Sequence, residues 1–266
     1  MPQAVPALPP GYRLLTFKEL DSTNAEAIRL ACAGETGPLW VLAGAQTLGR
    51  GRSGRTWVSV PGNLYASLLV RVDCQPDAIH QLSLLGGVAT WDAIRAVAAE
   101  DGRELPGLRL KWPNDLLIDG AKLVGILPES MAVPGAAGAF LAVIGIGINL
   151  AGHPGDLGRA VTDLAAHGCP TTPERMLEAL AVAMETWLGR WNNGAGFGLV
   201  REAWLQRAGA VGEPMTVNTG RETVEGNFLG IDAEGALVLR DQGGIDRRFT
   251  YGDVALGVAA GAKDQR

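Results

Sequence analysis

Four strand-like runs follow one another between residues 108 and 150, and this succession constrains the fold more than any other feature. Each run is short and apolar or alternating, and no helical pattern separates it from the next. Asp119 and Gly120 stand between the second and third runs and form the strongest hairpin-turn signal of the sequence. We therefore predict a mostly antiparallel sheet from LRLKW (108–112), DLLI (115–118), KLVGIL (122–127) and AFLAVIGIGINL (139–150).

Further strands and several helices are expected around this sheet. The apolar segments 39–44 and 63–72 predict two buried strands. A short helix is expected near the N-terminus, where Thr23 and Glu26 have capping-box spacing and Gly34 suits the position after the last turn. Apolar residues at helical spacing predict three more helices, over 76–101, 173–191 and 197–208.

The character of the sequence changes near residue 210. Short apolar runs, separated by glycines and acidic turn residues, predict a small all-β barrel of roughly fifty residues. We expect residues 1–210 to form an α+β domain, in which helices cover the mixed and mostly antiparallel sheet. Residues 211–266 are expected to form the separate barrel.

Composition narrows the class of protein. The formal net charge of −5 and the pI near 5.3 argue against nucleic acid as the main ligand, because phosphate binding needs a broadly basic face. The N-terminus has no basic region followed by a long apolar run, so neither a signal peptide nor a membrane anchor is expected. The cysteines Cys32, Cys74 and Cys169 are widely spaced and form no CxxC pair, which favours reduced thiols in a cytoplasmic protein.

A glycine-rich loop carries the clearest sign of a binding site. No acidic residue occurs between Glu35 and Asp73, yet Arg50, Arg52 and Arg55 fall within six positions of this loop. Arginine forks bind carboxylate and phosphate groups bidentately, and the intervening glycines allow the backbone to approach a ligand. In an acidic protein the loop therefore predicts a local anion site, although an exposed surface loop is the alternative for arginines taken alone.

Two segments nearly match known nucleotide-binding motifs, but neither fits its motif completely. GRGRSGRT resembles a phosphate-binding P-loop, but Arg55 stands in the place of the lysine and a strand, not a helix, is expected to follow. GIGIN (145–149) would fit a dinucleotide fingerprint only with a glycine at the position of Leu150. Its glycines permit close packing against the strand as readily as ligand binding, so Asn149 at the strand end is the better functional candidate.

Polar groups also gather where the strands are interrupted. Pro113 breaks the strand pattern and presents Lys111 and Asp115 on either side. Lys122 enters an otherwise apolar strand and could alone be an ordinary surface lysine. No HExxH, GxSxG or Cys/His pairing is found, which argues against a zinc hydrolase or a serine or cysteine nucleophile.

In this order, DSTN (21–24), Gln46, GRGRSGRTW (49–57), KWPNDLL (111–117), KLVGIL (122–127) and GIGIN (145–149) resemble the biotin protein ligase family. Each motif alone is modest, but the ordered set is specific and covers residues 14–150. The resemblance implies a class II synthetase-like catalytic domain followed by an SH3-like barrel. It also implies an AMP-forming ligase that converts biotin and ATP to biotinyl-AMP and then transfers biotin to a lysine of a carrier protein.

The resemblance assigns a role to each polar group. The residues implied to bind biotin are Ser22, Thr23, Asn24, Gln46, Arg50, Gly51, Arg52 and Lys122. Those implied on the nucleotide side are Arg52, Arg55, Trp57, Asn114, Asp115 and Asn149. Those implied to act in catalysis are Lys122, Arg52 and Lys111. Asp115 is also the candidate ligand for Mg²⁺.

The sequence differs from the usual family pattern in two respects, and the resemblance also suggests binding partners. Pro128 stands where the family usually has a β-branched residue, so we expect it to end or bulge the strand and place ligation by Glu129 in doubt. About twenty residues precede DSTN, so the winged-helix repressor domain of long family members is not expected. The resemblance suggests the biotin carboxyl carrier domain of acetyl-CoA carboxylase as partner and makes a homodimer plausible.

Two other functions stay open at this point. One is a lipoate ligase or octanoyl transferase, which shares the fold but has no ureido ring to pair with the DSTN cluster. The other is a sensor that binds biotin or its adenylate without turnover. The loop arginines, Lys111 and Lys122 favour an active ligase over the sensor.

Overall fold

The computed structural model describes residues 6–155 and 158–257, which form an α+β unit and a smaller all-β unit. A seven-stranded sheet in the order β1-β2-β3-β7-β6-β5-β4 forms the centre of the larger unit. Only β1 and β2 pair in parallel; all other neighbours are antiparallel, as the sequence predicted. The strands are β1 (Arg13–Phe17), β2 (Leu39–Ala43), β3 (Leu64–Asp73), β4 (Leu108–Lys111), β5 (Asp115–Ile118), β6 (Ala121–Ala132) and β7 (Ala139–Ile148).

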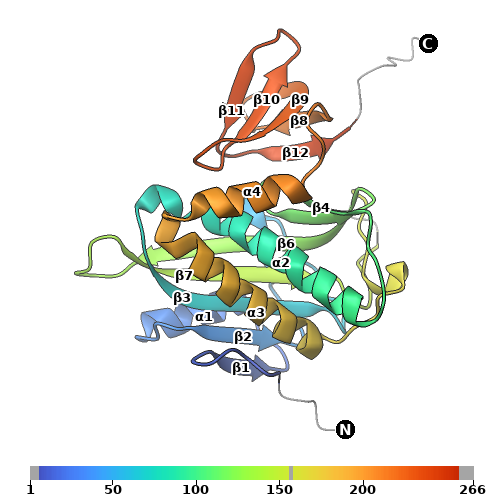
Figure 1. The fold of residues 1–266 in the computed structure, drawn as a ribbon. Helices are drawn as coiled ribbons and strands as arrows, with labels where there is room; N and C mark the ends of the chain where they lie inside the picture. The colour runs from blue at the N-terminus through green and yellow to red at the C-terminus, as the bar shows by residue number, and fades with distance from the viewer. Residues whose placement is uncertain (1–5, 156–157, 258–266) are drawn as a thin grey trace.

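Helices cover both faces of this sheet, but unequally (Figure 1). Three of them, α2 (Gln81–Glu100), α3 (Pro173–Trp191) and α4 (Phe197–Arg207), lie on one face. The other face carries α1 (Thr23–Cys32). The long helix expected over 76–101 is divided, since a short 3₁₀ turn at Pro76–Ala78 precedes α2.

Alternation along the strands separates the two faces. In β7, Ala142, Ile144 and Ile146 join the large core beneath α2 and α3. Leu141 and Val143 point to the opposite face and pack in a smaller cluster with Ala27 and Ala31 of α1. Because side chains alternate along a strand, the glycines of the GIGIN motif lie on the face that carries α1.

Helix α2 is the main apolar element of the core. Its residues Leu82, Leu85, Val88 and Ile94 are fully buried. The segment Pro76–Glu100 is long and apolar enough to cross a membrane by length and composition, but 67% of the tested window is buried within the protein. That burial is typical of the central helix of a globular core.

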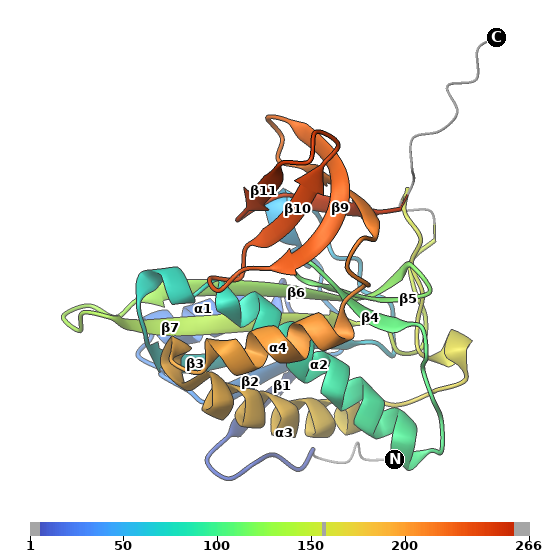
Figure 2. The same cartoon turned by 45° about the horizontal axis from the view of Figure 1, so that its top comes forward.

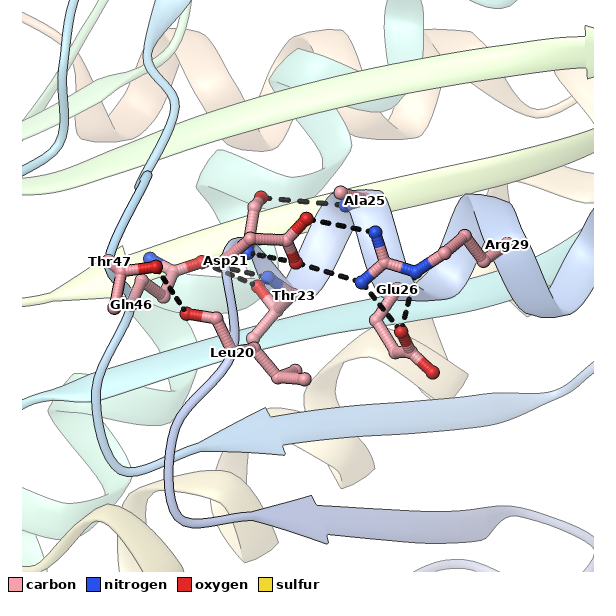
Figure 3. A network of polar contacts seen from close by, with 9 residues as sticks. Leu20, Asp21, Thr23, Ala25, Glu26, Arg29, Gln46 and Thr47 are labelled. Carbon is pink, nitrogen blue, oxygen red and sulfur yellow. Dashed lines mark hydrogen bonds and ion pairs between the residues drawn. The ribbon is translucent and has the colours of Figure 1, made fainter.

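The start of α1 differs by one residue from the predicted cap. Ser22 has an extended backbone and its hydroxyl accepts a hydrogen bond from the amide of Ala25, so Ser22 and not Thr23 caps the helix. Glu26 does not reach back to the cap, because its carboxylate binds Arg29 (Figure 3). Arg29 also contacts both carboxylate oxygens of Asp21 and so ties the first turn of the helix to the preceding loop.

Pro128 does not interrupt β6, contrary to expectation. The strand continues past it and pairs with β7 without a shift, with Pro128 opposite Ile144. The amide of Ile126 points away from β7 and donates to the carbonyl of Asn114. Alternation gives the nitrogen of Pro128 the same direction, so its missing N–H removes no bond to β7. Glu129 therefore keeps a fixed place within β6, opposite Val143.

The smaller unit is a five-stranded antiparallel sheet in the order β11-β10-β9-β8-β12. It lies beside α4 and β4 at one end of the larger unit (Figure 2). Trp112 donates to the carbonyl of Gly235 and Arg109 binds Glu213 at 2.7 Å, which joins the two units. The strands are β8 (Pro214–Asn218), β9 (Thr223–Ile231), β10 (Leu237–Asp241), β11 (Asp246–Phe249) and β12 (Asp253–Leu256).

Candidate active site

A cavity of about 330 Å³ opens on the α1 face of the sheet, where α1 begins. Residues from the loop before α1, the arginine loop, β5, β6, β7 and the smaller unit line it. The structure thus brings together segments more than two hundred residues apart in sequence. The predicted site residues in its lining are Ser22, Thr23, Asn24, Gln46, Arg50, Gly51, Arg52, Arg55, Trp57, Lys111, Asn114, Asp115 and Lys122.

One end of the cavity is formed by amide and hydroxyl groups. Gln46 Oε1 accepts from the amide of Thr23 at 2.8 Å and lies 3.2 Å from its hydroxyl (Figure 3). Asn24 Nδ2 donates to the carbonyl of Leu127 and to Glu129. These groups offer donors and acceptors at fixed positions, which suits a ligand that carries both.

The glycines of β6 and β7 make room for particular side chains. A Cβ at Gly145 would lie 2.1 Å from Asn24 Oδ1, and one at Gly147 would lie 2.6 Å from the ring of Trp57. A Cβ at Gly125 would also meet that ring at 2.6 Å. The GIGIN glycines therefore permit close packing, and the side chains packed on them line the cavity.

The arginine loop is held at three points. Arg50 contacts Glu129 at 2.7 Å, Arg52 donates to Asn114 Oδ1 at 3.0 Å, and Arg55 pairs with Asp253. Arg52 also donates to the backbone carbonyl of Gly252, so two of these points involve the smaller unit. Burial lowers the pKa of Arg52, yet an arginine this basic stays charged at neutral pH. The loop presents fixed cations to the cavity.

The charged floor consists of two lysines around one carboxylate. Lys122 contacts Asp115 Oδ1, and Lys111 Nζ lies 3.5 Å from the other oxygen. The pKa of Lys122 is lowered because burial disfavours its charged form, and the neighbouring Asp115 offsets part of this effect. Lys122 Nζ also lies 5.6 Å from the centre of the Trp57 ring. Lys122 is thus a cavity cation rather than a surface lysine.

Asn149 is the one predicted site residue outside the lining of this cavity. It is buried, donates to the carbonyl of Thr162 at 2.9 Å and lies 3.4 Å from the amide nitrogen of Asn63. Its amide supports the chain segment that follows β7, and it borders a smaller pocket that also contains Trp57 and Lys122. Its assignment to the nucleotide side stays a prediction.

Several residues near the site were missed by sequence analysis. Ser67 in the middle of β3 is fully buried and binds Asn24, whereas an alternating strand pattern gives no sign of a functional hydroxyl. Arg159 reaches the cavity from the segment after β7. The smaller unit adds Asp253, Val254 and Ala255 from β12. Among residues 6–155 and 158–257, no cluster of three histidine, cysteine or acidic residues could hold a metal ion.

Comparisons with known proteins place the chain among protein ligases. The model of the Biotin/lipoate A/B protein ligase family matches residues 17–149, and that of the Biotin protein ligase C terminal domain matches residues 211–257. The chain belongs to the biotin protein ligase family.

Individual relatives and structures support this membership. A biotin–[acetyl-CoA-carboxylase] ligase of Paracoccus denitrificans is 41% identical over 84% of this chain and 92% of its own length. The bifunctional ligase/repressor BirA of Escherichia coli is 31% identical over 92% of this chain and 74% of its own length. The biotin protein ligase of Aquifex aeolicus, solved with biotin and ATP, is 24% identical, with a TM-score of 0.74 over 92% of this chain and 98% of that one, which supports the fold.

Proposed function

We propose that this protein activates biotin with ATP to biotinyl-AMP and transfers the biotin to a lysine of a biotin carrier protein. One observation carries the proposal: a single cavity is lined both by the amide and hydroxyl groups of Thr23, Asn24 and Gln46 and by the cations Arg50, Arg52 and Lys122. Biotin has the matching polarity, with a ureido ring at one end and a carboxylate at the other. The names of the relatives from Paracoccus denitrificans and Escherichia coli support the same activity.

The polar end recognises the ring in this proposal. Ser22, Thr23 and Gln46 offer hydroxyl and amide groups, and Gly51 of the arginine loop also lines the cavity. A ligand that cannot pair with these groups would leave them desolvated and unsatisfied. The polar end therefore favours biotin over a lipoyl or octanoyl chain.

The cationic end supports the first chemical step. A carboxylate oxygen of biotin attacks the α-phosphorus of ATP, the bond to the β-phosphate breaks, and pyrophosphate leaves. Two anions must approach each other, and Lys122 and Arg52 neutralise the charge that accumulates on the reacting oxygens. Asp115 holds Lys122 and Asn114 holds Arg52 inside the cleft, so little reorganisation is needed.

The second step transfers the biotinyl group. The neutral amine of a carrier lysine attacks the acyl carbon of the anhydride, AMP leaves, and the amine gives up a proton. Arg52 keeps the AMP phosphate in place until then, and Lys111 contributes positive charge beside Asp115. An ordered arginine loop shields the anhydride from water.

The nucleotide is assigned to the side of the cleft formed by Arg55, Trp57 and Asn114, with Asn149 behind Trp57. The indole Nε1 of Trp57 is buried with no partner among the residues that the structure describes, so it can donate to a ligand. Mg²⁺ enters with ATP as part of the substrate. Both oxygens of Asp115 face ammonium groups, an arrangement that suits charge pairing and does not fit a metal ligand.

The remaining expectations about partners and place belong to the same proposal. The partner is the biotin carboxyl carrier domain of acetyl-CoA carboxylase, as the name of the Paracoccus denitrificans relative suggests. A cytoplasmic location agrees with a need for ATP and with three cysteines that form no disulfide in the structure. The boundary near residue 210 and a homodimer stay predictions.

The direct test is transfer to a carrier. The purified protein is mixed with biotin, ATP, Mg²⁺ and a purified apo-carrier domain, and the carrier is analysed by mass spectrometry. We expect a mass increase of one biotinyl group that is lost when the acceptor lysine of the carrier is replaced by arginine. Tight biotin binding with no modified carrier would favour the sensor, and transfer of lipoate instead would favour the rival ligase.

A further inference from the structure

Four polar side chains form a continuous chain behind the polar end of the cavity. The Thr23 hydroxyl lies 2.8 Å from the Ser67 hydroxyl, and Ser67 lies 2.6 Å from Asn24 Oδ1. Asn24 Nδ2 then lies 2.8 Å from Glu129 and 3.0 Å from the carbonyl of Leu127. Thr23, Ser67 and Asn24 are all at most 4% exposed, so water does not compete for these bonds.

The two acceptors at the far end determine the direction of every bond. A backbone carbonyl such as that of Leu127 can only accept, and Glu129 beside Arg50 is an ionised carboxylate that also only accepts. Asn24 must therefore turn its NH₂ group toward them. Its oxygen is left to accept the single hydrogen of the Ser67 hydroxyl. Ser67 can then contribute only a lone pair to its other neighbour, Thr23.

Thr23 stands at the end of the chain next to the cavity. Its hydroxyl hydrogen has two acceptors within the protein, Ser67 at 2.8 Å and Gln46 Oε1 at 3.2 Å. Ser67 is the nearer acceptor, and Gln46 Oε1 already accepts from the backbone amide of Thr23 at 2.8 Å, so the hydroxyl hydrogen is used on Ser67. The hydroxyl thus presents only lone pairs to the cavity, which makes it an acceptor for an N–H group of a ligand.

We propose that Ser67 and Glu129 are positioning residues that fix the Thr23 hydroxyl as an acceptor for a ring N–H of biotin. The inference rests on the proposed function, since it names the ligand group that Thr23 receives. It also changes the role expected for Asn24, whose NH₂ group is fully used within the protein and whose oxygen lies against Gly145. Asn24 orients the Ser67 hydroxyl by accepting its hydrogen and does not itself bind the ring.

The same chain joins the ring pocket to the arginine loop. Glu129 binds Asn24 through Oε2 and Arg50 through Oε1. Replacement of Glu129 by glutamine keeps one acceptor oxygen for Asn24 but removes the charge opposite Arg50. Replacement by leucine removes both, so a comparison of the two variants isolates the acceptor.

The first part of the test is calorimetric binding of biotin to wild type, Ser67→Ala and a control, Thr90→Ala. Thr90 is also a fully buried hydroxyl, but it donates to Gly86 within α2, away from the cavity. We expect Ser67→Ala to raise the Kd for biotin on the order of tenfold to a hundredfold, as for loss of buried hydrogen-bond partners. Thr90→Ala should leave the Kd unchanged, and thermal unfolding of each variant verifies that it is folded.

The second part uses lactam analogues of biotin in which one ring NH is replaced by CH₂. Wild type should discriminate against the lactam that lacks the NH facing Thr23, whereas Ser67→Ala should lose most of that discrimination. Glu129→Leu should weaken biotin binding severalfold more than Glu129→Gln. Equal losses for biotin and both lactams in Ser67→Ala, or equal effects of the two Glu129 variants, would overturn the proposal.

Wild-type binding separates this inference from the proposed function. A wild-type protein that does not bind biotin contradicts the proposed function. It also overturns the proposal that Ser67 and Glu129 position Thr23. If wild type binds biotin, the ratios of Kd values between the variants test only the positioning role of Ser67 and Glu129.

Discussion

Lys122 and Asp115 form an ion pair on the floor of the cleft, with side chains only 13% and 10% exposed. Lys111 contributes a second ammonium group at 3.5 Å from the same carboxylate. The cluster therefore carries a net positive charge in a place where water screens it poorly. An anion that enters the cavity meets a cation that has already lost most of its hydration.

Substitution of Lys122 by glutamine tests whether this cation acts on the reaction. The change keeps most of the side-chain length but removes the charge, so adenylation should fall on the order of a hundredfold or more. Lys18→Gln is the control, because Lys18 is an exposed lysine outside the cavity lining. Activity is measured as the formation of biotinyl-AMP from biotin and ATP, and circular dichroism verifies folding. Near-normal adenylation in a folded Lys122→Gln protein would contradict the role.

The lowered pKa of Lys122 predicts a limit at alkaline pH. The charged form is lost when the pH rises through the folded pKa, which lies below the ordinary value of 10.5. The kcat/KM for adenylation should therefore decline with a midpoint below pH 10.5, since this parameter reports the free enzyme. The free energy of unfolding should instead rise with pH over this range. The reason is that the unfolded chain binds the Lys122 proton more tightly than the folded protein does.

Lys122→Arg is the matching variant for this profile. Arginine stays charged throughout the range, so the variant should retain less activity but lose the alkaline decline. A profile that keeps the same midpoint in Lys122→Arg would show that another group titrates.

Local patterns were sufficient for much of the fold. The predicted turn at Asp119 and Gly120 joins β5 to β6, and both residues have positive φ, as a tight hairpin turn requires. Pro128 was misjudged because its effect depends on which neighbouring strand its nitrogen faces, and that direction is set by pairing with β7. Sequence spacing alone does not contain this information.

The residues of the cavity lining that lie on short motifs were found from the sequence, whereas residues brought near the cavity by tertiary contacts were missed. The arginine loop and Lys122 have recognisable sequence surroundings, whereas Ser67 is one small residue in a buried strand. Asn149 turned into the protein to hold Thr162, a contact thirteen residues away that no periodicity indicates.

The ion pair between Arg55 and Asp253 predicts that the smaller unit restrains the arginine loop. Both side chains are about half exposed, so Asp253→Asn should change the free energy of unfolding by less than about 1 kcal/mol. Thermolysin cleavage next to the exposed Leu48 and Val58 should nevertheless become severalfold faster.

Two controls make this measurement specific. Arg240→Gln removes a comparably exposed pair with Asp246 within the smaller unit and should leave loop cleavage unchanged. The charge swap Arg55→Asp with Asp253→Arg should restore protection. Unaltered cleavage in Asp253→Asn would mean that the loop is held by its other contacts.

Substitution by alanine should have opposite effects at Gly147, which packs against Trp57, and at Gly189, which has open space around it. Gly147→Ala places a Cβ at 2.6 Å from the ring of Trp57, so the ring must move, with an expected loss of about 1–3 kcal/mol of stability and of most adenylation. Gly189→Ala meets nothing within 4 Å on the exposed face of α3 and should stabilise the protein by about 0.5–1 kcal/mol. Urea unfolding and activity assays compare the two; a Gly147→Ala protein as stable and active as wild type would contradict the packing argument.

Exchange of labelled pyrophosphate into ATP tests the central claim most directly. If the cleft forms biotinyl-AMP reversibly from its own groups, exchange needs only the purified protein, ATP, Mg²⁺ and biotin, with no carrier present. We expect exchange that depends on biotin, is not supported by lipoate or octanoate, and is largely abolished by Lys122→Gln. Exchange supported equally by lipoate, or none with any carboxylate despite tight biotin binding, would contradict it.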